Sequence, residues 1–369
     1  MPIDMALNQS LLLCNIRRDP VMFRQITEAR INDLHCKFDE ESGLKSVIAI
    51  HSTRRGPALG GCRIIPYSSS DEAITDAIRL ARGMSYKSAL AGLDLGGGKA
   101  VIMEPEGDYD RKALFEAFGR FLNELGGRYA TAMDSGTTVA DMDTIATQSP
   151  HVTCTSSCGS PAPFTAEGVY YGVLACLKAH PALPDHLKGL SVAVQGLGNV
   201  GYSLCERLSN DGAQLIVADI NQDRVDQCVR EFGAKAVAPD EIYSVPCDLF
   251  SPCGLGGILN SDTIGQLQCA AVAGSANNQL LTEEDGIALF DREILFAPDY
   301  LINSGGLIFV AMTYLQSSQN DMHRRLRGIH DTLLQIFSRQ NQAGLPASVI
   351  ADQMAEAIVY GDDASQLTA

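Results

Sequence analysis

Residues 192–201 have the sequence VAVQGLGNVG, in which Gly196, Gly198 and Gly201 form a Gly-x-Gly-x-x-Gly pattern after an apolar run. This pattern is typical of the turn between a strand and a helix in a dinucleotide-binding βαβ unit. Gly196 would permit the tight turn, Gly198 would let a pyrophosphate approach the backbone, and Gly201 would let helix and strand pack closely. The helix start at Asn199 and Val200 would offer unpaired N–H groups to the phosphates.

An acidic residue follows at the expected distance. Residues 214–218 form a second apolar run that ends at Asp219, 18 residues after Gly201. A carboxylate there accepts hydrogen bonds from ribose hydroxyls and repels a 2′-phosphate, which favours NAD over NADP. The alternatives are a Rossmann-shaped domain without a dinucleotide and, for Asp219 alone, an ordinary turn residue.

The rest of the chain supports two domains of an α/β protein. Strand and helix patterns alternate after residue 190, which predicts a parallel sheet with helices on both faces. The predicted segments are 191–195, 200–210, 214–218, 224–232, 248–250 and 270–273. Residues 153–163 read as a boundary loop, followed by a helix over 165–178 that Thr165 could cap, and residues 320–360 have helical periodicity. We therefore predict a first domain over 1–150 and a second over 151–329.

The first domain mixes strands and helices. We expect a strand over 46–51, helices over 70–84 and 111–125, and a short strand over 100–103. Three glycines, residues 96–98, precede that last strand and indicate a special backbone conformation or the close approach of another group.

Two lysines and an aspartate stand out in this domain. Lys99 follows the glycines and leads into the apolar strand, so it could be partly buried, with a lowered pKa suited to proton transfer. Lys87, at a helix end, could simply be solvated. Asp134 lies in TAMDSGTT, where capping of a helix by Asp134 or by the threonines is as compatible with the spacing as catalysis.

Composition excludes several classes of protein. The formal net charge of -16 argues against nucleic acid and anionic membrane surfaces as partners. No apolar run reaches the roughly 18 residues of a membrane span, and no basic segment precedes residues 11–13, so we expect a cytoplasmic protein. The 11 cysteines would then be reduced, and their spacing predicts no metal site.

Several motifs together resemble the Glu/Leu/Phe/Val amino-acid dehydrogenase family, and leucine dehydrogenases most. The matching segments are 56–63, 84–87, 96–99, 134–138, 196–201, 252–256, 274–280 and 297–306. The resemblance implies an N-terminal α/β substrate domain and a Rossmann-type, doubly wound NAD-binding domain, with the active site in the cleft between them. It also implies that the C-terminal helices, residues 330–369, pack back onto the first domain.

Roles for individual residues follow from the resemblance. Lys99 resembles the catalytic lysine that activates water, and Asp134 the carboxylate that shuttles a proton with the substrate nitrogen. The residues that resemble substrate-binding positions are Lys87, for the α-carboxylate, with Gly60, Gly61 and Asn278. The further residues assigned to the cofactor are Thr165, Asn277 and Asn303. The implied reaction is oxidative deamination, in which an amino acid gives a 2-oxo acid and ammonia.

The side-chain pocket suggests an apolar substrate. The glutamate enzymes of this family carry a lysine where this chain has Leu59, and an apolar residue cannot pair with a distal carboxylate. The positions that resemble the family's pocket are Leu59, Ala132, Leu307 and Val310. We expect a substrate of the leucine, valine or isoleucine type; Leu307 is shared with phenylalanine dehydrogenases, so an aromatic substrate is the alternative.

Two rival functions and the assembly remain open. A non-catalytic NAD-binding regulator would need no intact Lys87, Lys99 and Asp134. A hydroxy-acid dehydrogenase would use a histidine near an acid, and no histidine here has such a context. The resemblance also implies a homo-oligomer, and the first 30 or so residues, unlike the family, could serve its contacts.

Overall fold

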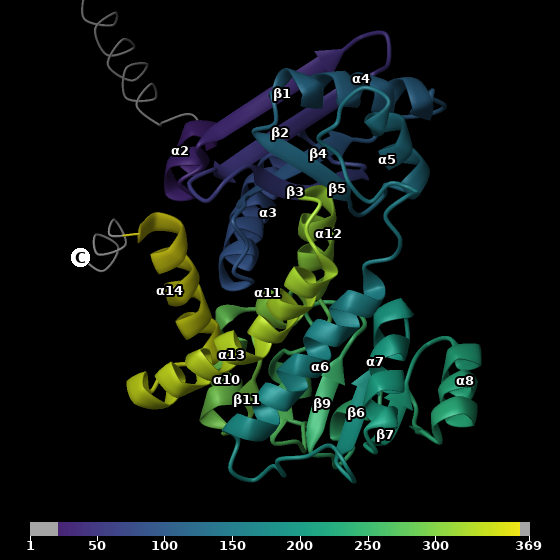
Figure 1. The fold of residues 1–369 in the computed structure, drawn as a ribbon, viewed down its shortest axis with the longest axis vertical. Helices are drawn as coiled ribbons and strands as arrows, with labels where there is room; N and C mark the ends of the chain where they lie inside the picture. Colours follow the sequence, from purple (N-terminus) through teal and green to yellow (C-terminus); the bar gives the residue numbers. More distant parts are fainter. Residues whose placement is uncertain (1–20, 362–369) are drawn as a thin grey trace, which may run out of the picture. The chain divides into compact units, whose positions relative to one another are not determined.

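The computed structural model describes residues 21–361 and divides into two compact units (Figure 1). Within the described residues, the N-terminal unit comprises 21–53, 57–84 and 97–151. The C-terminal unit comprises 54–56, 85–96 and 152–361. The predictions for residues 11–13, the start of the first predicted domain and the end of the predicted C-terminal segment 330–369 fall outside the described residues.

The N-terminal unit contains a five-stranded mixed sheet in the order β1-β2-β4-β3-β5. Its strands are β1 (Asp33–Asp39), β2 (Leu44–Ser52), β3 (Ala58–Ile65), β4 (Gly96–Met103) and β5 (Tyr129–Met133). Strand β2 pairs antiparallel with β1 and β4, whereas β3 pairs parallel with β5. The predicted strand over 100–103 is longer than expected, because its three glycines belong to β4 itself.

Helices cover both faces of this sheet (Figure 1). The unit holds α2 (Val21–Glu28), α3 (Ser70–Leu90), α4 (Arg111–Glu124) and α5 (Val139–Ala146), and the unit boundary crosses α3 after residue 84. Ala73, Ala77 and Ala81 repeat at helical spacing on α3 and pack against Val47 and Ala49 of β2. The predicted helix over 70–84 is confirmed and runs on to residue 90.

The C-terminal unit confirms the predicted parallel sheet, with strand order β11-β10-β9-β6-β7-β8. Its strands are β6 (Ser191–Gln195), β7 (Gln214–Ala218), β8 (Lys235–Ala236), β9 (Leu249–Pro252), β10 (Ala271–Val272) and β11 (Leu295–Phe296). The order reverses at β6, so the chain winds outward in both directions from that strand. This reversal is the usual place for a ligand in a doubly wound sheet.

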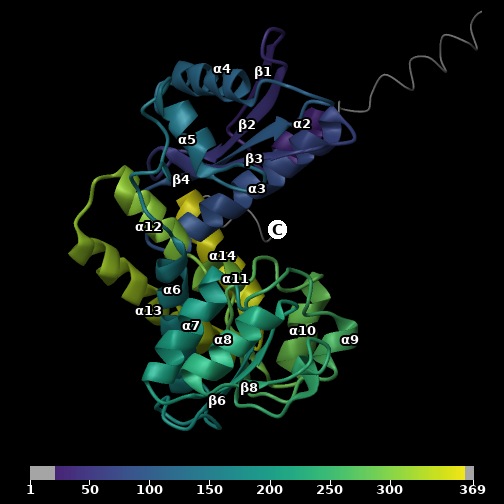
Figure 2. The same ribbon diagram turned by 90° about the vertical axis from the view of Figure 1, so that its right-hand side faces the viewer.

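Helices cover both faces of this second sheet, with α7 and α8 on one side and α9 and α10 on the other (Figure 2). The helices after the boundary are α6 (Ala162–Ala179), α7 (Asn199–Asn210), α8 (Gln222–Phe232), α9 (Ser261–Ile264), α10 (Glu283–Asp291), α11 (Asp299–Ile302), α12 (Gly305–Tyr314), α13 (Gln319–Ala343) and α14 (Ala347–Tyr360), with a 3-10 turn over Ile242–Ser244. The core beneath α9 and α10 includes Phe250, Val272 and Leu289.

One local prediction needs correction, and another is refined. Thr165 does not cap α6, because that helix starts three residues earlier, after Pro161, and the Thr165 hydroxyl donates to the Pro161 carbonyl at 3.2 Å. The predicted helical periodicity over residues 320–360 is confirmed and is divided between the two helices α13 and α14. The break lies at Gly344, whose φ of 66° ends α13 in a left-handed cap, and at Pro346, which cannot continue a helix.

Candidate active site

The glycine-rich turn joins β6 to α7 in the C-terminal unit. Gly196 has a φ of 91°, and a Cβ there would lie 2.6 Å from the backbone nitrogen of Gly254. A Cβ on Gly201 would lie 2.0 Å from the Gly196 carbonyl oxygen. Both positions therefore require glycine for the turn and for the helix–strand contact.

The space beside Gly198 is different. Its nearest neighbour would be a guanidinium nitrogen of Arg224, 3.7 Å from an added Cβ, so the protein itself does not crowd this position. Gly198 also precedes α7 without a side-chain cap. The first N–H groups of the helix thus have no capping side chain, as a phosphate site requires.

A cavity of about 280 Å³ opens beside this turn. Its lining comes from the start of α6, the glycine-rich turn, α7 and α8. The lining residues are Ser160, Ala162, Pro163, Leu197, Gly198, Asn199, Tyr202, Arg224 and Gln227. The cavity brings the predicted residues Gly198 and Asn199 together with Arg224, which no sequence pattern had indicated.

Asp219 lies at the end of β7, half-buried, next to the same turn. Its Oδ2 accepts the backbone N–H of Leu197 at 2.5 Å, and its Oδ1 accepts the N–H of Asn221 at 2.8 Å. The carboxylate therefore fixes the shape of the glycine-rich turn. Spacing alone predicted the location of Asp219 but not this bond to the turn.

Lys99 and Asp134 form an ion pair in the N-terminal unit. Lys99 extends from β4 and is 5% exposed, and its Nζ donates to Oδ2 of Asp134, which directly follows β5. Burial lowers the pKa of Lys99, although the Asp134 carboxylate opposes this shift. Burial would raise the pKa of Asp134, yet the Lys99 and Arg63 cations hold it below its ordinary value. The pair is thus a buried proton donor and acceptor in direct contact.

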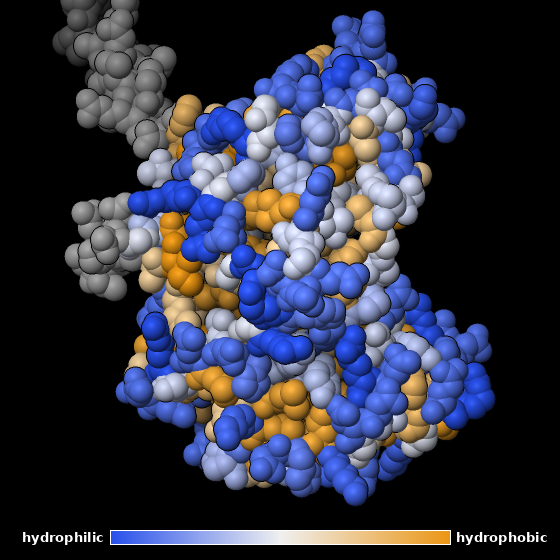
Figure 3. Space-filling view, in the orientation of Figure 1, coloured by the Kyte–Doolittle hydropathy of each residue, from blue (hydrophilic) through white to orange (hydrophobic). Residues whose placement is uncertain are grey.

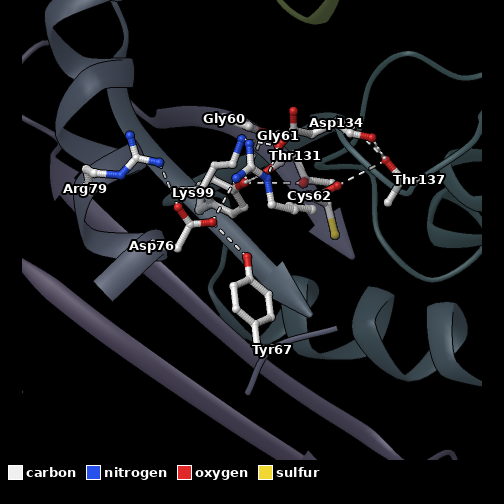
Figure 4. A network of polar contacts seen from close by, with 12 residues as sticks. Gly60, Gly61, Cys62, Tyr67, Asp76, Arg79, Lys99, Thr131, Asp134 and Thr137 are labelled. Atoms are coloured by element: carbon white, nitrogen blue, oxygen red, sulfur yellow. Dashed lines mark hydrogen bonds and ion pairs between the residues drawn. The ribbon is translucent and has the colours of Figure 1, made fainter. Parts of the chain in front are cut away.

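The helix-capping alternative for Asp134 is wrong. Thr138 is the N-cap of α5, and Asp141 completes a capping box, because its carboxylate accepts the Thr138 N–H at 2.7 Å. Asp134 is instead held by Thr137, whose hydroxyl accepts the Asp134 N–H at 2.8 Å (Figure 4). The capping is done by other residues, which leaves the Asp134 carboxylate for Lys99.

Gly60 and Gly61 lie on β3 and make room for this pair. A Cβ on Gly61 would lie 2.6 Å from the Asp134 Cβ and 3.3 Å from the Lys99 Nζ. A Cβ on Gly60 would meet the Gly98 carbonyl oxygen at 1.8 Å. The hydroxyl of buried Tyr129 reaches the Gly60 carbonyl oxygen at 3.0 Å, a contact that no sequence pattern indicated.

Lys87 lies in the last turn of α3, in the part that belongs to the C-terminal unit. It is half-buried rather than fully solvated, and its Nζ donates to Oδ1 of Asn303 at 2.5 Å. The Asn303 amide donates in turn to Oδ1 of Asn277 at 2.8 Å. Three predicted residues therefore form one chain of hydrogen bonds, although Lys87 and Asn303 are 216 positions apart and Asn303 and Asn277 are 26 positions apart.

The remaining predicted residues also have definite places. Exposed Asn278 has a φ of 50°, in the left-handed region. Leu59 and Ala132 are buried on the neighbouring strands β3 and β5 of the N-terminal unit. Leu307 and Val310 are buried one turn apart on α12 of the C-terminal unit.

Comparisons with known proteins show the family of the chain. A family model described as "Glu/Leu/Phe/Val dehydrogenase, dimerisation domain" matches residues 29–151. A second, described as "Glutamate/Leucine/Phenylalanine/Valine dehydrogenase", matches residues 214–355. The chain belongs to the Glu/Leu/Phe/Val dehydrogenase family, as its motifs predicted, and it is an amino-acid dehydrogenase.

Its relatives include enzymes for different apolar amino acids. A leucine dehydrogenase of Thermoactinomyces intermedius is 51% identical over 322 residues, which is 86% of this chain and 88% of that protein. A valine dehydrogenase of Streptomyces virginiae is 43% identical over 86% of this chain and 90% of that one. The crystal structure of L-tryptophan dehydrogenase from Nostoc punctiforme is 39% identical, with a TM-score of 0.84, over 93% of this chain and 99% of that one.

Neither a membrane-spanning helix nor a metal-ligand cluster occurs among the described residues. Among the described helices, none combines the length and apolar character that a bilayer span requires. Residues 21–361 also contain no group of three or more His, Cys, Asp or Glu placed to hold a metal ion.

Proposed function

We propose that this protein catalyses the NAD-dependent oxidative deamination of an apolar L-amino acid of the leucine, valine or isoleucine type, giving the 2-oxo acid and ammonia. The observation that carries the proposal is the buried Lys99–Asp134 pair, which joins a lysine of lowered pKa to a carboxylate. Such a pair can move protons at neutral to alkaline pH. The relatives that are named leucine and valine dehydrogenases support the same reaction.

The proposed cofactor fits the glycine-rich turn. Gly198 leaves open space, α7 begins without a side-chain cap, and Asp219 lies at the end of the next strand. The N–H groups at the start of α7 would bind the pyrophosphate. The Asp219 carboxylate would accept hydrogen bonds from the ribose hydroxyls and would repel a 2′-phosphate. When bound, NAD supplies the acceptor for the hydride that leaves the substrate Cα. Thr165, Asn277 and Asn303 are proposed as further cofactor contacts.

Lys99 is proposed as the base. Once the substrate Cα–H bond has given up its hydride, the carbon carries an iminium group that water can attack. Neutral Lys99 takes a proton from this water as its oxygen bonds to Cα, which forms the carbinolamine. Asp134 then relays that proton from Lys99 to the nitrogen. The carbinolamine hydroxyl returns its own proton to Lys99 as the C=O bond forms and the C–N bond breaks, and ammonia and the 2-oxo acid leave.

Lys87 is proposed to pair with the substrate α-carboxylate. Its ammonium group is already oriented by Asn303, so less conformational freedom is lost when a carboxylate binds. Gly60, Gly61 and Asn278 would lie beside the substrate. Because Asn303 also bonds Asn277, the carboxylate site and a proposed cofactor contact share one residue.

The pocket residues favour an apolar side chain. Leu59 is fully buried and offers no charge to a distal carboxylate, and burying that carboxylate unpaired would be costly. Ala132, Leu307 and Val310 would complete the pocket. An aromatic substrate is the second candidate, because the L-tryptophan dehydrogenase of Nostoc punctiforme has the same fold at 39% identity.

Initial rates of NADH formation at alkaline pH test the proposal. Leucine, valine, isoleucine, phenylalanine, tryptophan and glutamate would be compared, with Lys99→Ala as the inactive variant and exposed Lys112→Ala as its matched control. We expect turnover with aliphatic substrates that is lost only in the Lys99 variant. Turnover with glutamate alone would overturn the Leu59 argument, and NADH binding without turnover of any amino acid would favour a regulator.

Assembly and location are part of the same proposal. The N-terminal family model carries the description "dimerisation domain", and we propose a homo-oligomer that works in the cytoplasm. Light scattering on a size-exclusion column would give the subunit count, and a monomer at micromolar concentration would contradict the proposal.

A further inference from the structure

Arg63 lies between two carboxylates in the N-terminal unit. Its Nε donates to Oδ2 of Asp134 at 3.2 Å, and its Nη1 donates to Oδ2 of Asp76 at 2.9 Å. The three side chains are only 20%, 24% and 15% exposed. A planar guanidinium that bridges two partly buried carboxylates has little freedom to move.

The fold places Arg63 there by two independent elements. Strands β3 and β5 pair in parallel with Cys62 opposite Met133, so the next residues along, Arg63 and Asp134, are neighbours. Asp76 comes from α3. Its carboxylate is fixed by the hydroxyl of Tyr67 at 2.8 Å and the guanidinium of Arg79 at 2.9 Å (Figure 4).

Both cations on Asp134 use the same oxygen. Lys99 and Arg63 each donate to Oδ2 rather than Oδ1. The two oxygens of this carboxylate are therefore unequal: Oδ2 holds both cations, and neither cation donates to Oδ1.

We propose that Arg63 is a positioning residue for the Lys99–Asp134 pair, and that Asp76 is the anchor that holds Arg63 in place. The inference rests on the proposed function, because it assigns Arg63 a part in the same proton transfers. Arg63 fixes Asp134 through Oδ2 and turns Oδ1 toward the reaction. It also pairs with the Asp134 carboxylate, whose negative charge would otherwise act on Lys99 alone.

The charges around Lys99 explain why such sharing matters. The charged or titratable groups that face its ammonium are Asp134 after β5, and Arg63 and Cys62 on β3. Burial is the main cause of the lowered pKa of Lys99, the Asp134 carboxylate acts against it, and the Arg63 cation acts with it. Arg63 thereby lets Asp134 stay ionised without fixing Lys99 as an ammonium ion.

Arg63→Gln tests the charge. Loss of the cation raises the pKa of Lys99, so the acid limb of the kcat/KM profile for deamination moves to higher pH. We expect kcat/KM near neutral pH to fall about tenfold to a hundredfold, as for a lost charge-assisted hydrogen bond. Arg120→Gln, an exposed arginine of the same unit, is the matched control and should leave the limb in place.

Arg63→Lys and Asp76→Asn test the position. The lysine keeps the charge but cannot reach both carboxylates as a planar fork, and the asparagine removes only the far anchor. We expect both variants to lose kcat while their acid limbs do not move to higher pH. KM for the amino acid should change little, because the inference has Arg63 act through Asp134 rather than on the substrate.

A measurement of the protonation of Lys99 that does not depend on turnover separates this inference from the proposed function. Only the neutral amine reacts with acetic anhydride, a reagent that does not itself ionise, so the pH dependence of Lys99 acetylation, followed by peptide mass spectrometry, reports its protonation. Arg63→Gln should need higher pH for the same rate. An unshifted acetylation profile, together with unchanged kcat in Arg63→Lys and Asp76→Asn, would overturn the inference, whereas a wild type without amino-acid turnover would contradict only the proposed function.

Discussion

Gly61 and Asp134 approach each other so closely that a Cβ on Gly61 would lie 2.6 Å from the Cβ of Asp134. The same added atom would lie 3.3 Å from the Lys99 Nζ. The ion pair thus occupies the space that a side chain at position 61, on the neighbouring strand β3, would fill. This explains why two polar groups can meet on a sheet whose other residues are mostly apolar.

Gly61→Ala should therefore separate Lys99 from Asp134. The added methyl group overlaps Asp134, and overpacking of this kind costs about 1–3 kcal/mol of folding free energy. We expect kcat to fall at least about a hundredfold, since a small misplacement of reacting groups has that effect. Steady-state kinetics and thermal unfolding would measure both changes.

Gly83→Ala is the matched control for that substitution. Gly83 lies on the exposed side of α3, with nothing within 4 Å of an added Cβ. Alanine should stabilise the helix by about 0.5–1 kcal/mol and leave kcat unchanged. If Gly61→Ala kept full activity, the steric argument for the ion pair would fail.

The glycine-rich turn shows what the sequence could predict. Strands β6 and β7 have the predicted bounds, because short apolar runs between glycines and polar residues leave few alternatives. The burial of Lys99 was also predictable, from three glycines and an apolar strand around it. These signals are local, and local patterns are read directly from neighbouring residues.

Contacts between distant residues were not predictable in this way. Lys87 and Asn303 are 216 residues apart, and nothing in either neighbourhood specifies the other. Arg63 and Asp76 belong to a strand and a helix whose relative position only packing decides. The choice between Asp134 and Thr138 as the helix cap likewise depended on backbone geometry, since both residue types cap well.

Lys87→Met should weaken substrate binding selectively. The variant keeps the length of the side chain but loses the charge proposed to pair with the α-carboxylate. We expect KM for the amino acid to rise about tenfold to a hundredfold, as for a lost charge-assisted bond. The dissociation constant of NADH, measured by fluorescence, should change much less; an equal loss for both ligands would argue against a role in carboxylate binding.

Asp219→Ser should relax the choice of cofactor. The carboxylate both fixes the Leu197 N–H and is proposed to repel a 2′-phosphate, so its loss weakens NAD binding and removes the repulsion. We expect the ratio of kcat/KM for NAD over NADP to fall at least about tenfold. A ratio equal to that of the wild type would show that Asp219 serves the turn alone.

Asp141→Asn should destabilise the N-terminal unit in a pH-dependent way. Hydrogen bonds from Arg111 and Thr138 hold the pKa of Asp141 below its ordinary value against the effect of burial. A lowered folded pKa adds stability above the unfolded pKa of about 3.9, and this stability is lost as the pH falls through the folded value. In urea unfolding, the free energy of unfolding of the variant should therefore be about 1–3 kcal/mol below that of the wild type at neutral pH, and this difference should shrink in acid. A difference independent of pH would contradict an ionic origin of the stabilisation by Asp141.

The rate of deamination should rise with pH until Lys99 is neutral. Burial favours the neutral amine and lowers the pKa of Lys99, while the Asp134 carboxylate keeps part of the population protonated. Because only the neutral amine can take a proton from water, kcat/KM should increase with pH from neutrality and level off below the ordinary lysine pKa of about 10.4. Initial rates over that range, with the amino acid well below its KM, would measure the limb. The reverse reaction needs Lys99 protonated and should lose rate over the same interval, so a flat profile in both directions would remove Lys99 as the base.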